Sequence, residues 1–71
     1  MDELALLREL ADAVRDERQA ASVYESAMYL ATHDKDFDRH VAAARAAMAR
    51  RCHAWARQER ILVELGNGSP A

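Results

Sequence analysis

Apolar residues recur every seven positions along both halves of the chain. In the first half the row consists of Leu7, Val14, Ala21 and Met28. In the second half the row consists of Val41, Met48, Trp55 and Leu62. This spacing is typical of a helix that buries one face along its whole length. The pattern therefore predicts two amphipathic helices. Their expected core consists of these two rows and of the apolar residues interleaved with them on the same face, Leu10, Tyr24, Ala31, Phe37, Ala44 and Leu65.

Short polar side chains separate the two rows. Residues 32–38 read Thr-His-Asp-Lys-Asp-Phe-Asp, and such residues cap one helix end and start the next. Both glycines and the single proline, which break helices, come after residue 65. The sequence predicts an all-α fold, an antiparallel two-helix hairpin resembling a coiled coil. The expected helices span about 2–31 and 38–65, with a turn at 32–37 and a flexible C-terminal tail at 66–71.

The hairpin implies a register between the two rows. If the turn centres near Asp34, large residues face smaller ones across the seam. The expected pairs are Leu7 with Leu62, Val14 with Trp55, Ala21 with Met48, and Met28 with Val41.

Each helix carries a second apolar row beside the first. These residues are Leu6, Ala13, Ala20, Ala27, Ala47, Ala54 and Ile61. A chain of 71 residues has a small core of its own, worth about 3–5 kcal/mol, and gains stability from assembly. We therefore expect this second row to bind a helix of a protein partner, a second copy of the chain, or both. The alternative is that alanine occupies these positions only because of its helix propensity. If the row is an interface, Ala20→Glu or Ala54→Glu should abolish assembly and leave the hairpin helical.

The charges divide between the two halves. Residues 1–31 carry a net charge of −4 and residues 39–65 carry +4, so opposite charges favour side-by-side helices. An arginine stripe on the second helix offers possible phosphate contacts at Arg39, Arg50, Arg57 and Arg60. The overall charge of −2 argues against nucleic acid and favours a solvated face.

Catalytic, cofactor and metal sites are not expected. The single cysteine excludes an internal disulfide, and Asp34, Asp36 and Asp38 start like a calcium loop that lacks its later ligands. Glu17 lies at a core position and needs a partner, either Arg51 or Arg18. The first residues are acidic and no long apolar run follows, so we expect neither a signal peptide nor a membrane span. A cytoplasmic location is expected.

Two resemblances bear on function. The acidic first helix, the turn at 36–38, the alanine-rich second helix and the terminal segment 61–65 resemble the small co-chaperones of type III secretion needle subunits. That resemblance implies a helical hairpin that keeps a needle subunit soluble before export. The segment Ala49-Arg50-Arg51-Cys52 followed by Glu59-Arg60 is similar to the end of the small subunit of exonuclease VII. That family binds a larger catalytic chain.

The sequence thus favours a non-catalytic protein–protein interaction module, a small co-chaperone or accessory subunit that binds an amphipathic helix of a partner. The alternative is an accessory subunit of a nucleic-acid-processing complex that uses the arginine stripe.

Overall fold

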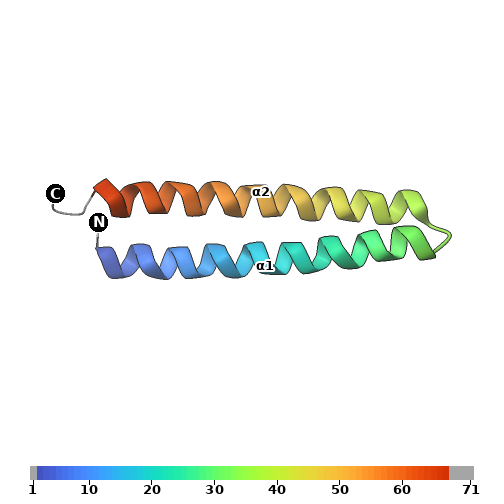
Figure 1. Ribbon diagram of the computed structural model, residues 1–71, viewed down its shortest axis with the longest axis horizontal. Coiled ribbons are helices and arrows are strands. Elements are labelled where there is room, and N and C mark those ends of the chain that lie inside the picture. The colour runs from blue at the N-terminus through green and yellow to red at the C-terminus, as the bar shows by residue number, and fades with distance from the viewer. Residues whose placement is uncertain (1, 68–71) are drawn as a thin grey trace.

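Two long helices lie side by side as an antiparallel hairpin (Figure 1). The computed structural model describes residues 2–67. Helix α1 spans Glu3–His33 and helix α2 spans Phe37–Asn67, with 31 residues in each. Each helix is about 46 Å long at 1.5 Å per residue. The predicted all-α hairpin is confirmed.

The helices are slightly longer than the sequence predicts. Helix α1 continues two residues beyond position 31, and α2 begins at Phe37 rather than 38. At the other end, Gly66 and Asn67 belong to α2 and not to a tail. Gly66 has no positive φ angle, so it extends the helix and does not cap it. The rest of the expected tail, residues 68–71, lies outside the described residues.

Asp34 organises the turn. Its backbone N–H donates to the carbonyl of Leu30 at 2.8 Å and so ends α1. Its carboxylate accepts from the Lys35 N–H at 2.6 Å and contacts Nε2 of His40, in the first turns of α2, at 2.9 Å. One side chain therefore ties the end of α1 to the start of α2.

The buried core is made mostly of alanine. Within residues 2–67 the buried apolar residues are Leu6, Ala13, Ala20, Ala27, Ala31, Ala44, Ala47, Ala54 and Ile61. Ala13 and Ala47 have no exposed surface at all. Because alanine carries only a methyl group, it lets two helix backbones approach closely along the seam.

This core corrects the predicted one. All seven residues expected to bind a partner are buried between α1 and α2: Leu6, Ala13, Ala20, Ala27, Ala47, Ala54 and Ile61. The eight residues of the two expected core rows are displaced to its edge and are intermediate or exposed. Of the residues predicted between those rows, Ala31 and Ala44 are buried as expected. The two rows differ by one residue, which is a rotation of 100° about each helix axis. The structure buries the row that permits the closer approach, and the bulkier row lies beside it.

The expected register agrees with the contacts between helices. Arg51 Nε donates to Glu17 Oε1 at 3.0 Å, and Arg57 donates to Asp16 Oδ2 at 2.9 Å. These contacts place residues 16–17 beside 51–57, the level at which Val14 was expected to face Trp55. The chain thus folds back at the predicted point, with both helices rotated relative to the prediction.

No helix within residues 2–67 combines the length and the apolar character needed to cross a membrane.

Candidate docking surface

The ion pair between Asp16 and Arg57 distinguishes the two sides of the hairpin. Asp16 lies three residues after the buried Ala13, and Arg57 lies three residues after the buried Ala54. Since these two side chains touch, residues three positions after the core row lie on the same side in both helices. Residues one position after the core row point in a direction that differs by 160° around the helix axis from that of Asp16 and Arg57. They therefore lie on the opposite side of the seam.

That opposite side carries an apolar row on each helix, one row on either side of the Glu17–Arg51 ion pair. We call it the apolar flank and define it as the two rows Leu7, Val14, Ala21, Met28, Val41, Met48, Trp55 and Leu62. None of these eight side chains carries a charge. Leu7, Met28, Trp55 and Leu62 are exposed, and the other four are partly buried. The flank is therefore a strip of apolar surface facing solvent.

Trp55 lies near the middle of the flank and 45% of its surface is exposed. The guanidinium of Arg51 lies 4.6 Å from the centroid of its ring, a cation–π contact. Arg51 is also the partner of Glu17, so one arginine joins the ion pair at the seam to the flank. Of the two arginines predicted for Glu17, the structure selects Arg51.

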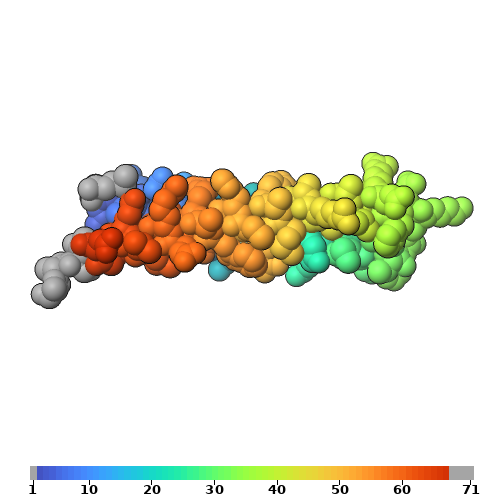
Figure 2. Space-filling model, turned by 90° about the horizontal axis from the view of Figure 1, so that it is seen from above, coloured from blue at the N-terminus to red at the C-terminus, as the bar shows by residue number. Residues whose placement is uncertain are grey.

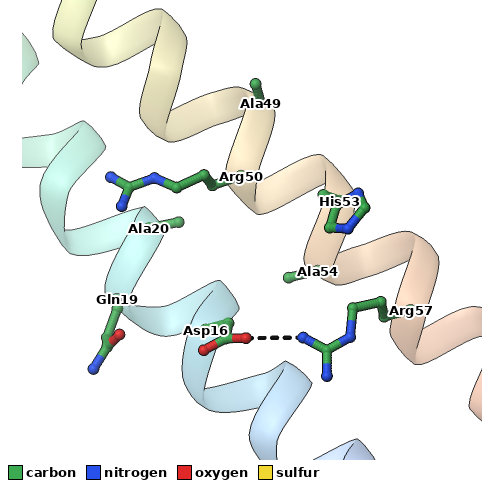
Figure 3. A pocket seen from close by; sticks show the side chains of 8 residues that line it. All are labelled: Asp16, Gln19, Ala20, Ala49, Arg50, His53, Ala54 and Arg57. Atoms are coloured by element: carbon green, nitrogen blue, oxygen red, sulfur yellow. Dashed lines mark hydrogen bonds and ion pairs between the residues drawn. The ribbon is translucent and has the colours of Figure 1, made fainter.

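A shallow hollow lies on the other side of the seam (Figure 3). It has a volume of about 430 Å³ and is lined by Asp16, Gln19, Ala20, Ala49, Arg50, His53, Ala54 and Arg57. In Figure 3, Arg50 extends from α2 toward α1 near Ala20, and Arg57 reaches Asp16. The hollow exists because the alanines beneath it are small.

The arginine stripe is only partly assembled into this hollow. Arg50 and Arg57 line it, whereas Arg39 and Arg60 lie outside it on the same helix. The carboxylate of Asp16 pairs with Arg57 and reduces the positive charge available to a phosphate. The hollow is thus of mixed charge and not a continuous basic surface.

Folding lowers the pKa of one carboxyl in the turn, that of Asp34. The hydrogen bond from His40, followed by that from the Lys35 N–H, holds the pKa of the Asp34 carboxyl below its ordinary value of 3.8. Within residues 2–67, no group of three His, Cys, Asp or Glu side chains is placed to hold a metal ion.

Several of these contacts were not predicted from the sequence. The pairing of Asp16 with Arg57 and of Asp34 with His40 was missed, as was the bond from Gln58 to the carbonyl of Ala13 at 3.5 Å. A search for opposite charges within one helical turn of the same level in the folded hairpin would have found the first. It would also have indicated which side of the seam is polar.

No protein-family model, curated protein or solved structure matches this chain.

Proposed function

We propose that this chain is a non-catalytic protein–protein interaction module that docks amphipathic helices through its apolar flank. The observation that supports the proposal is the pair of uncharged rows that make up the flank, with Leu7, Met28, Trp55 and Leu62 exposed. Exposed apolar patches of this kind mark interaction sites. Tryptophan in particular is enriched where partners bind most tightly.

The role is that of a small accessory or chaperone-type subunit. A groove between two helices accepts an apolar helix face that repeats at three and four residues, as amphipathic partner helices do. The resemblance to needle-subunit co-chaperones supports the same class of role and suggests an export pathway of the type III kind. The sequence predicted that the alanine row binds a partner, and we now assign that role to the flank.

Adjacent residues of α2 provide a matched test of the flank. Leu62 belongs to the flank, whereas Val63 is turned 100° further around α2, and each has 56% of its surface exposed. We expect the Leu62→Glu variant to lose helical partners captured from the native cell. The Val63→Glu variant should retain them. Partners are identified by mass spectrometry after capture on tagged wild-type and variant chains.

Equal recovery of every protein by the two variants would contradict the proposal. Circular dichroism of both variants checks that each remains helical. A partner whose recovery depends on Leu62 and not on Val63 binds through the flank.

The alternative function is an accessory subunit that meets nucleic acid through Arg39, Arg50, Arg57 and Arg60. Its test is binding of a labelled single-stranded oligonucleotide between about 50 and 200 mM salt. Several phosphate contacts would weaken binding steeply over that range, whereas apolar helix docking changes little. If the chain binds the oligonucleotide tightly, if salt weakens that binding and if Arg50→Gln abolishes it, the nucleic-acid function is supported over helix docking.

A further inference from the structure

The hairpin exposes more surface than a folded chain of its mass normally does. Its accessible surface is 5452 Å² for 8.0 kDa, whereas compact monomers of that mass expose about 4,450 Å². The Cα radius of gyration is 16.2 Å, compared with about 11 Å for a compact domain of this length. The excess surface, on the order of 1,000 Å², is similar to what each partner buries in a stable interface, about 800 Å².

The excess arises because the molecule is a single layer. Figure 2, seen from the side of α2, shows α1 lying largely behind α2, and the Cα atoms extend 56 × 14 × 14 Å. Domains normally bury the apolar faces of their helices between two packed layers. Here the one layer buries mainly alanine methyl groups, and larger apolar side chains stay exposed, among them Leu7, Met28, Trp55 and Leu62 of the flank.

A second layer would have to match the flank in length and in charge. A second copy of this hairpin meets the requirement of length, because its own flank consists of the same two rows. The two helices of one copy differ in charge, with −4 over residues 1–31 and +4 over residues 39–65. A half-turn about the long axis places the acidic α1 of one copy on the basic α2 of the other.

The residues that border the flank favour the same orientation. Glu25 and Arg45 each lie four residues after a member of the flank, and they lie at equal levels of the hairpin. The half-turn about the long axis sets Glu25 of one copy near Arg45 of the other, twice in the assembly. A half-turn about the perpendicular axis also pairs opposite charges, Arg45 with Glu59, but it brings Arg18, the midpoint of α1, onto Arg18 of the second copy. Like charges there oppose association.

We infer that a second copy of the chain covers the apolar flank. The two hairpins form a four-helix bundle with both turns at the same end. This inference rests on the proposed function, because it assigns an occupant to the same flank. A helix of another protein would then compete with the second copy for that surface.

Sedimentation equilibrium from about 1 to 100 μM tests the assembly. Wild-type chain is expected to sediment as a dimer at the upper concentrations. Dilution is expected to shift the fluorescence of Trp55, the single tryptophan, toward longer wavelength as its ring becomes exposed. Leu62→Glu should raise the dimer dissociation constant at least about tenfold, and Val63→Glu should change it less than about twofold. A wild-type monomer at 100 μM overturns the inference.

A spin label at the turn tests the orientation. The label is placed with Lys35→Cys in a Cys52→Ser chain, and the distance between labels in the dimer is measured by pulsed electron paramagnetic resonance. With both turns at one end the labels are separated by less than about 30 Å, whereas opposite ends separate them by about 45 Å, one helix length. The longer distance overturns the proposed orientation. A monomer that still captures a helical partner through Leu62 refutes the second copy and leaves the proposed function intact.

Discussion

At the scale of the residue, the alanines determine how close the two helices lie. Burying a methyl group releases much less free energy than burying a leucine side chain. The seven buried alanines within residues 2–67 therefore give the hairpin close packing and only a modest hydrophobic gain. A larger or charged side chain in this row has no space, because the opposing helix occupies it.

Ala54→Glu is accordingly expected to unfold the hairpin. Ala54 is 2% exposed, so the variant places four further heavy atoms, three of them a carboxylate, in a filled seam without a partner. We expect a loss of more than about 3 kcal/mol of unfolding free energy, measured by urea denaturation. Ala56→Glu, an exposed position on the same helix, is the control and should change stability by less than about 0.5 kcal/mol. A helical Ala54→Glu hairpin would restore the partner-surface interpretation of this row.

Asp34 gives the hairpin an acid-sensitive turn. Since folding lowers the pKa of its carboxyl, it stabilises the folded state above the ordinary value of 3.8 and loses that effect as the pH falls through the folded pKa. Asp34→Asn should therefore melt below wild type at pH 5, and the difference should shrink below about pH 4. Thermal unfolding followed by circular dichroism from pH 6 to 2 checks this. Glu9→Gln, an exposed carboxylate on α1, controls for the general effect of removing one charge. A difference that is constant over the whole pH range would contradict the role of Asp34.

At the scale of the element, the seam combines apolar packing with a partly buried ion pair between the helices, Glu17 with Arg51. The side chains of Glu17 and Arg51 are 18% and 29% exposed, so water screens them only in part. Removing one partner leaves a poorly solvated charge, whereas removing both leaves none.

A double-mutant cycle on this pair should be non-additive. Glu17→Leu or Arg51→Leu alone is expected to cost about 1–3 kcal/mol, because each strands the other charge. The double variant should be at least as stable as the wild type, since two leucines fill the seam. Urea unfolding at one fixed protein concentration measures the four stabilities. Additive losses would show that the two side chains act independently.

Helix ends and register were predictable from sequence because their signals are local. The polar residues around Asp34 mark the turn, and heptad spacing places Val14 at the level of Trp55. The rotation of the helices was not predictable in the same way, because two adjacent rows are both apolar. Choosing between Ala20 and Ala21 as the buried residue depends on backbone approach in three dimensions. Area burial by itself favours the bulkier row, which led to the wrong choice.

At the scale of the whole molecule, the candidate site follows from that rotation. A single layer that buries its small side chains leaves larger ones at its surface, and Leu7, Met28, Trp55 and Leu62 are the exposed ones on the flank. The sequence indicated more apolar surface than the hairpin can bury, and the rotation of the two helices decides which residues expose it. Leu62 and Met28 are exposed, whereas Ala20 and Ala54 are buried.

Association through the flank makes stability depend on concentration. If dimers unfold to separate chains, mass action raises the melting temperature as the protein becomes more concentrated. With an unfolding enthalpy of about 0.7 kcal/mol per residue, a dimer of this chain should gain about 10 °C over a hundredfold rise in concentration. Differential scanning calorimetry from about 5 to 500 μM measures the shift. The melting temperature of Leu62→Glu should be lower than that of the wild type and should not change with concentration. The melting temperature of Val63→Glu should rise with concentration as that of the wild type does. A wild-type melting temperature that does not change with concentration would mean that the alanine seam alone stabilises the hairpin.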